Sequence, residues 1–295
     1  MTTLDYETVS RYWSTAAPSI LGPYMMDGFG FPAGAGRFRF HAECKIVDRL
    51  TQGISPAGCV LDLGSGIGFW TEYFARRFAR VIAIEGSVPL HQELEERCAP
   101  YSNVKLVHGD VMLFQPEDQY DVVCLGGMLM YLNKEDVISL LRRLIPFLQP
   151  GSVVLCRETT VRQGTTTRQG NYQAVYRSIA DYEGIFAECE LSIPKVQLNV
   201  PYVLMQMGCE LVTKWKTVVP TRLQCIPIVG RLVYWGLRLG YPWITRVPIA
   251  LGLAYPELTN HFFLLQPDSP IASNSRSCDH IAQKDSLEAQ VRECR

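Results

Sequence analysis

The sequence lacks the cysteine patterns that announce metal sites or disulfide frameworks. It contains ten cysteines, but none form a CxxC pair and no His/Cys cluster has zinc-like spacing. We therefore expect no metal, and reduced thiols in a cytosolic compartment are the simplest interpretation. The N-terminus also lacks a basic stretch followed by an apolar run, which argues against a secretory signal.

A strong excess of charge of either sign is also missing, since the net charge is −1. A general nucleic-acid binder would be strongly basic, so no nucleic-acid partner is expected. The 295 residues are 47% hydrophobic and 19% charged, which is ordinary for a folded protein with a sizeable core. This length suits one large domain, or one domain with an elaboration.

Acidic residues are absent from one long segment, residues 211–256. The segment holds six cations: Lys214, Lys216, Arg222, Arg231, Arg238 and Arg246. The rest of the chain then carries 22 cations against 29 acids, so this segment is distinctly basic. Its longest uncharged stretch, residues 247–256, is well short of the roughly 20 residues that a membrane-spanning helix needs.

Strand-like and helix-like patterns alternate through the middle of the chain. The predicted strands, rich in Val, Ile, Leu or Cys, are residues 59–63, 81–85, 104–108, 121–125, 152–157 and 261–266. The predicted helices are residues 40–53, 70–78, 87–98 and 134–148, and a further helix–strand unit covers residues 181–198. Apolar strands separated by helices predict an α/β fold with a doubly wound, mainly parallel, seven-stranded Rossmann-like sheet.

Composition divides the chain into five predicted regions. They are an N-terminal lid (1–40), a core of alternating strands and helices (41–200), an apolar, basic helical insertion (201–256), the last core strand (257–267) and a polar, disordered tail (268–295). The Gly-rich stretch before residue 40 favours a mobile loop over a regular element.

A glycine-rich turn follows the first predicted strand, in "VLDLGSGIGFW" at residues 60–70. Gly64, Gly66 and Gly68 lack Cβ atoms, so the backbone there can adopt positive φ and a ligand can approach the main chain. Together with Ser65 they predict a cradle for a small ligand.

Two acids indicate that this ligand is a nucleoside. Asp62 precedes the glycines, and Glu85 ends the next predicted strand, 17 residues after Gly68. In a doubly wound fold, the first turn and the tip of the second strand lie side by side, so an acid there can accept both hydroxyls of a ribose.

The spacing of the glycines argues against a dinucleotide as this nucleoside ligand. Dinucleotide sites usually read GxGxxG, whereas this turn reads GxGxG. "VHGDV" adds Gly109, Asp110 and Val111 after the third strand, where the acid can accept a hydrogen bond from an adenine amino group, and Gly126 at the end of the fourth strand would also border the ligand.

This ordered set resembles the class I S-adenosylmethionine (AdoMet)-dependent methyltransferases over residues 55–160. The resemblance implies AdoMet as cofactor and methyl transfer as activity. In one alternative, the same residues only form turns and caps of a Rossmann-like core. In another, the chain is a binding protein that keeps the AdoMet fold without turnover.

A closer resemblance, to the protein N-terminal methyltransferase family, lies in "YWSTAAPSILGPYMMDGFG", "DLGSGIGFWT" and "VYRSIADYEGIFAECEL". In that family the first stretch closes over the ligands. By position, the resemblance implies that Trp13 lines the substrate channel and that Met25 is a lid contact to AdoMet. Alternatively, both residues pack a short N-terminal helix.

The chain departs from that family at positions that matter for the substrate. Phe69 stands where the family carries an arginine for the AdoMet carboxylate, so Arg37 or Arg39 must serve instead. Tyr131 replaces a histidine, and "RQGNYQAVYR" contains no carboxylate to hold a peptide amine. We therefore expect a small, lipophilic acceptor, with a protein N-terminal amine as the alternative.

Few side chains remain for acid–base work: Glu158, Tyr131, His108 and Tyr172. Glu158 is the predicted general base, needed only if the acceptor carries a proton. The alternative for Glu158 is a salt bridge to Arg157 or Arg177. Tyr131 and Tyr172 are expected to contact the acceptor as well, whereas His108 caps or packs a strand end.

The resemblance does not account for the basic segment. Arg231 and Arg238 lie seven residues apart among apolar and aromatic residues, which is typical of one helical stripe. Such a segment suits peripheral contact with an anionic membrane surface. A cap over the active site or a dimer interface is the alternative, with its arginines reaching water.

Overall fold

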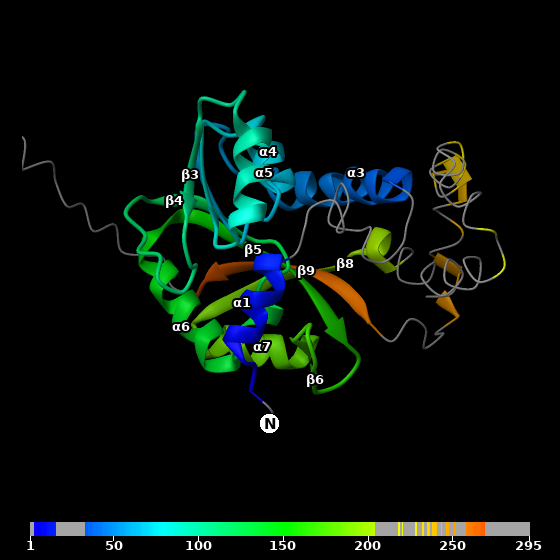
Figure 1. Ribbon diagram of the computed structural model, residues 1–295. Helices are drawn as coiled ribbons and strands as arrows, with labels where there is room; N and C mark the ends of the chain where they lie inside the picture. Colours follow the sequence, from blue (N-terminus) through cyan, green and yellow to red (C-terminus); the bar gives the residue numbers. More distant parts are fainter. Residues whose placement is uncertain are drawn as a thin grey trace, which may run out of the picture.

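The computed structural model describes residues 3–15, 33–203 and 258–268, with single positions between 218 and 251 (Figure 1). Helices cover both faces of a central sheet. One face carries α3 (Ala33–Leu50), α4 (Phe69–Ala75) and α5 (Val88–Cys98), and the other carries α6 (Lys134–Leu144) and α7 (Ile179–Glu188). A separate short helix, α1 (Tyr6–Thr15), lies in front of the sheet in this view.

Within the described residues, the sheet contains nine strands. In chain order they are β1 (Cys59–Leu63), β2 (Arg80–Glu85), β3 (Val104–His108), β4 (Tyr120–Leu125), β5 (Leu148–Val161), β6 (Thr165–Arg168), β7 (Ala174–Ser178), β8 (Leu191–Leu198) and β9 (Thr259–Pro267). The first five are parallel, in the order β3-β2-β1-β4-β5. β9 then joins β5 antiparallel, and β8 pairs with β9. Because β1 lies between β2 and β4, the order reverses there, and ligands bind at such a switch point.

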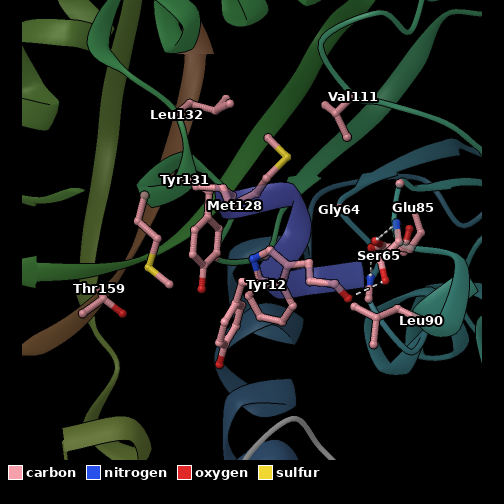
Figure 2. Close-up of a pocket in the computed structure, with 18 of the residues that line it drawn as sticks. Tyr12, Gly64, Ser65, Glu85, Leu90, Val111, Met128, Tyr131, Leu132 and Thr159 are labelled. Atoms are coloured by element: carbon pink, nitrogen blue, oxygen red, sulfur yellow. Dashed lines mark hydrogen bonds between the residues drawn. The ribbon is translucent and has the colours of Figure 1, made fainter. Parts of the chain in front are cut away.

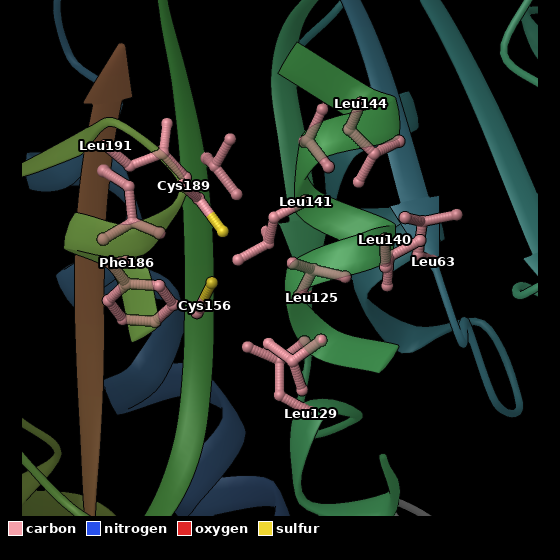
Figure 3. Packing of buried hydrophobic residues seen from close by; sticks show 14 of the residues in the cluster. Leu63, Leu125, Leu129, Leu140, Leu141, Leu144, Cys156, Phe186, Cys189 and Leu191 are labelled. Atoms are coloured by element: carbon pink, nitrogen blue, oxygen red, sulfur yellow. The ribbon is translucent and has the colours of Figure 1, made fainter. Parts of the chain in front are cut away.

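Successive side chains of a strand point to opposite faces of the sheet, so the strands contribute to two apolar cores, one on each face. Leu61 and Leu63 of β1 face α6 and α7, whereas Val60 faces α3 and α4. Figure 3 shows the first core, where leucines of α6 meet Leu125 of β4 and Cys156 of β5. Burial on both faces is why these strands are almost wholly apolar.

The predicted α/β doubly wound sheet is confirmed, with one element missed. The hairpin of β6 and β7 extends the sheet beyond the end of β5, through pairs such as Thr160 with Arg177. β6 has the exposed sequence TTTR and carries no apolar signal. β5 is also longer than expected, so Glu158 lies inside the strand and not at its end.

The described residues cover only part of the predicted division into regions. α3 begins at Ala33, so residues 33–36, which were expected to belong to a mobile loop, are helical. Met25, most of the predicted insertion and the tail beyond Asp268 lie outside the described residues. Among the residues that are described, no helix is both long and apolar enough to cross a membrane.

Candidate active site

A cavity of about 820 Å³ opens at the carboxyl ends of the parallel strands (Figure 2). It is lined by the loops after β1, β3 and β4, by the end of β2, and by one side of α1. This volume is in the upper part of the range for ligand sites, so there is room for a nucleoside cofactor and a second molecule.

The glycine turn provides the floor of the cavity. Gly64 and Gly66 have positive φ values of 66° and 58°, which favour glycine. The amides of Gly64 and Ser65 donate to the Ile84 carbonyl at 2.9 and 3.0 Å, which ties the turn to the end of β2. A Cβ on Gly64 would lie 3.2 Å from Cγ of Met128, so a side chain there would crowd the loop after β4.

Glu85 is held at the rim of this turn. Its Oε2 accepts a hydrogen bond from the Gly66 amide at 2.7 Å, and its Oε1 accepts one from the Ser87 amide at 2.8 Å. The side chain is only 8% exposed, and burial raises the pKa of the carboxyl. The carboxylate lines the cavity with free lone pairs, as a ribose partner requires.

The loops after β3 and β4 complete this half of the cavity. Asp110 lines it, and its Oδ1 accepts from the Met112 amide at 2.8 Å. Val111 and Gly126 line it as well, and Trp70 packs against Gly126.

Three residues predicted to bind the cofactor do not line the cavity. Asp62 is 1% exposed and accepts a hydrogen bond from Thr71 Oγ1 at 2.7 Å, and burial raises its pKa to about 7. Gly68 has a φ of 83° and starts α4, and a Cβ there would lie 2.6 Å from Leu94 of α5. Gly109 donates its amide to the Glu85 carbonyl at 3.1 Å. These three residues support the loops that line the cavity but do not face it.

The other half of the cavity is aromatic. The rings of Trp13 and Tyr131 meet edge to face with centroids 5.3 Å apart, and those of Tyr12 and Tyr172 meet at 5.0 Å. Figure 2 shows Tyr12 of α1 beside Tyr131, which belongs to the short helix η2 (Leu129–Tyr131). The predicted acceptor residues Trp13, Tyr131 and Tyr172 are therefore brought together at the cavity wall.

Hydrogen bonds hold α1 over the cavity. Ser87 Oγ donates to the Trp13 carbonyl at 2.8 Å, and the Leu4 amide donates to Asn133 Oδ1 at 2.9 Å. The Tyr6 hydroxyl bonds to the Asp136 carboxylate and accepts from the Asn133 amide at 2.9 Å. This helix thus connects the cofactor half to the aromatic half.

The Tyr131 and Tyr172 hydroxyls lie 2.9 Å apart. Burial raises the pKa of both phenols well above their usual range, so neither is a phenolate at neutral pH. One hydroxyl donates to the other, and both stay protonated. The pair can therefore orient an acceptor, but it cannot act as a strong base.

The structure does not support Glu158 as the general base. The side chain is fully buried, does not line the cavity, and accepts from the amides of Leu129 and Met130 at 3.0 and 3.2 Å. The expected alternative was a salt bridge, but in the described structure the polar partners of this carboxyl are those amides and Tyr182. Arg177 donates to the carbonyls of Leu129 and Leu132, so η2 is clamped from both sides.

His108 plays no part in the cavity either. It lies at the end of β3, where Nε2 is 3.2 Å from the Gly86 carbonyl. This placement matches the strand-end role expected for it, and no histidine lines the cavity among the described residues.

Of the two arginines expected near the cofactor carboxylate, Arg39 lines the cavity and Arg37 is exposed. Phe69 also lines it, with Arg97 stacked on its ring at 3.7 Å from outside. Arg157 of β5 also lines the cavity, although the sequence analysis did not predict it as a site residue. The available signal was the pair of adjacent charges, Arg157 and Glu158, directly after an apolar run in this strand.

The chemical groups that line the cofactor half are those that AdoMet requires. The turn offers backbone without side chains, Glu85 offers acceptors for ribose hydroxyls, and Asp110 offers one for an adenine amino group. Across the described ranges, no three His, Cys, Asp or Glu side chains gather as a metal site would require.

Comparisons with known proteins agree with this geometry. Residues 60–151 match the sequence profile of a methyltransferase domain family. Phosphoethanolamine N-methyltransferase 1 of Triticum aestivum is 31% identical over 134 residues, which cover 44% of this chain but only 27% of that protein. Alpha N-terminal protein methyltransferase 1 of Drosophila melanogaster is 25% identical over 224 residues, covering 71% of this chain and 77% of that protein.

A solved structure shares the fold. A SAM-dependent methyltransferase from Leishmania major superposes with a TM-score of 0.55 at 17% identity, covering 66% of this chain and 76% of that one.

Proposed function

Because the chain carries a class I AdoMet-dependent methyltransferase domain, we propose that it transfers a methyl group to a small, lipophilic acceptor held in the aromatic half of the cavity. The observation that carries this proposal is the wall formed by Tyr12, Trp13, Tyr131 and Tyr172. Such rings give an apolar acceptor a large contact area, with the hydroxyls as polar handles.

The chemistry that AdoMet supplies when bound is an electrophilic methyl group on a sulfonium. The chain's own contribution is alignment and exclusion of water, which can supply much of the rate in an in-line displacement. α1 covers the cavity, and the clamp on η2 fixes Tyr131. A general base is needed only for an acceptor that carries a proton, and we assign none.

The runner-up acceptor is a protein N-terminal amine, favoured by the coverage of the Drosophila relative. A peptide amine is a cation that needs carboxylates near it. In the described lining, Glu85 and Asp110 lie on the cofactor side, and Asp136 is already bonded to the Tyr6 hydroxyl. The described lining therefore disfavours a cationic acceptor.

The test uses AdoMet with a trideuterated methyl group and a cell extract split into small-molecule and protein fractions. We expect the label in lipophilic compounds of the small-molecule fraction, detected by mass spectrometry. Label at protein N-termini would establish the runner-up. AdoMet binding by calorimetry without any labelled product would identify a binding protein instead.

A further inference from the structure

An arginine lies where the aromatic half of the cavity meets solvent. Arg168 is the last residue of β6, it is exposed, and it lines the cavity. Its backbone pairs with Ala174 of β7, so these two residues close the loop that carries Tyr172. The guanidinium carbon of Arg168 lies 5.0 Å from the centroid of the Tyr172 ring. A cation is thus attached to the mouth of the aromatic wall.

The hairpin of β6 and β7 is anchored to the rest of the site. The Thr165 hydroxyl donates to Asp181 of α7 at 3.0 Å. Arg177 of β7 donates to a backbone carbonyl of η2 at 2.9 Å, and η2 carries Tyr131. These bonds fix the position of Arg168 relative to the aromatic wall.

The aromatic wall separates Arg168 from the cofactor half. Trp13 packs at the edge of the cofactor half, beside Ile67. The ring centroids of Trp13 and Tyr131 lie 5.3 Å apart, and those of Tyr131 and Tyr172 lie 6.0 Å apart. A ligand that extends along this wall from the methyl donor therefore reaches Arg168 with its far end.

The carboxylates of the neighbouring elements have other partners. Asp5, whose amide donates to Gln173 Oε1 at 2.9 Å, uses its own carboxylate to cap the first turn of α1. Asp136, which lines the cavity, bonds to the Tyr6 hydroxyl. Within the described parts of the chain, no carboxylate forms an ion pair with Arg168. The charge of this guanidinium is therefore available to a ligand.

We propose that Arg168 binds an anionic group at the far end of the acceptor. The inference rests on the proposed function, because it takes the apolar part of the acceptor to lie along the aromatic wall. The acceptor is then an amphipathic organic anion, with a carboxylate, sulfate or phosphate at the mouth of the cavity. A guanidinium suits all three groups because its N–H donors pair with two oxygens of one group.

The position of Arg168 makes it a specificity residue and not a catalytic one. It lies at the other end of the aromatic wall from the cofactor half, so it contacts neither the methyl donor nor the attacking atom. Its charge stabilises the bound acceptor and the transition state alike, which lowers KM and leaves kcat unchanged. It selects against acceptors whose far end is neutral or cationic.

Two fluorescent dyes of similar shape test the site without turnover. 8-Anilinonaphthalene-1-sulfonate carries a sulfonate, and N-phenyl-1-naphthylamine is its uncharged counterpart. Both are titrated into the protein with the cofactor half filled by saturating S-adenosylhomocysteine. Arg168→Gln should weaken binding of the sulfonate by about threefold to tenfold and binding of the neutral dye by less than about twofold. The loss should shrink at high salt, because the site is exposed.

Three variants serve as controls. Arg162→Gln, at an exposed position just before the same hairpin and outside the described lining, should keep both affinities. Arg168→Lys keeps the charge but not the planar fork, so its affinity for the sulfonate should lie between wild type and Arg168→Gln. Trp13→Ala removes a ring of the wall and should weaken both dyes.

Each other outcome overturns a defined part of the argument. If Arg168→Gln leaves the sulfonate affinity unchanged, or weakens both dyes equally, while Trp13→Ala weakens both, the anion site is wrong and the proposed function stands. Dyes that do not bind the wild type, or that bind Trp13→Ala equally well, overturn the aromatic acceptor site itself. A fall in AdoMet affinity for Arg168→Gln, measured by calorimetry, would place the cofactor carboxylate at Arg168 and overturn its assignment to the acceptor.

The products of the reaction give an independent readout. After transfer of a trideuterated methyl group to compounds of a cell extract, the labelled lipophilic products should be retained by an anion-exchange resin. Arg168→Gln should raise the KM for these acceptors at unchanged kcat. Labelled lipophilic products that pass through the resin would overturn the anionic acceptor while supporting the proposed function. Absence of label from small molecules would be a failure of the proposed function instead.

Discussion

The two halves of the cavity are built in different ways. The cofactor half consists of short loops that follow β1 to β4, each next to its neighbour in the sheet, with backbone groups and two acids at the surface. The aromatic half collects Tyr12 and Trp13 from α1, Tyr131 from η2 and Tyr172 from the loop between β6 and β7.

Strand order alone therefore assembles the cofactor half, whereas the aromatic half depends on side-chain contacts particular to this chain. Strand order brings Gly64, Glu85, Asp110 and Gly126 together in any sheet of this topology. The aromatic wall depends instead on α1 docking against η2 and the start of α5, through contacts such as Ser87 with Trp13. We therefore expect changes in the first half to affect AdoMet binding and changes in the second to affect the acceptor.

The largest expected effect is in the cofactor half. Glu85→Ala removes the carboxylate that lines the cavity beside Gly66. Each charge-assisted hydrogen bond to a ribose hydroxyl contributes about 1.5–3 kcal/mol, so AdoMet affinity should fall tenfold or more. Calorimetry measures the change, thermal unfolding checks the fold, and Glu96→Ala on the exposed side of α5 is the control. Unchanged affinity in a folded variant would remove Glu85 from the site.

A smaller and more selective effect is expected in the aromatic half. Trp13→Ala deletes the ring that meets Tyr131, so the acceptor's KM should rise by roughly tenfold. AdoMet affinity should stay within about twofold, because the backbone carbonyl of Trp13 that accepts from Ser87 is kept and the lost ring packs only at the edge of the cofactor half, near Ile67 and Leu90. Trp13→Phe keeps a ring and should restore most of the KM. An equal loss of AdoMet affinity would mean that the two halves are not separable.

Sequence and structure agree best where a pattern is local. The turn from Gly64 to Gly68 and the acids Glu85 and Asp110 follow apolar strands, so their positions could be predicted from periodicity alone. Whether such a residue faces the ligand or the core was not predictable, because tertiary contacts decide it: Asp62 is bonded to Thr71, and Gly68 lies against Leu94. The hairpin of β6 and β7 was missed because its polar strand has no burial pattern.

The same limit applies to charged residues inside strands. Glu158 and Arg157 are neighbours in β5, and alternation sends their side chains to opposite faces of the sheet. Periodicity indicates that they point apart, but not which of them faces the cavity. Arg157 lines it, and Glu158 holds the backbone of η2.

The last and smallest effect tests this role of Glu158 through pH. Burial raises the pKa of its carboxyl from the ordinary 4.5 to about 7 in the folded protein. A raised pKa in the folded state means that the protonated form is favoured on folding. The resulting stability is present below pH 4.5 and is lost as pH rises through about 7, by about 1.4 kcal/mol per unit of pKa shift.

Glu158→Gln resembles the protonated form and has no charge to lose. Urea unfolding from pH 5 to 8 should therefore show the wild type losing a few kcal/mol relative to the variant as pH rises, with similar stabilities at the acidic end. Glu188→Gln, on the outer end of α7, should keep the wild-type slope, since its carboxylate pairs with Lys134 at the surface. Turnover of Glu158→Gln should stay within about tenfold of wild type, because the side chain only positions η2. A fall of about 10² to 10⁴ with AdoMet affinity retained would restore Glu158 as the base.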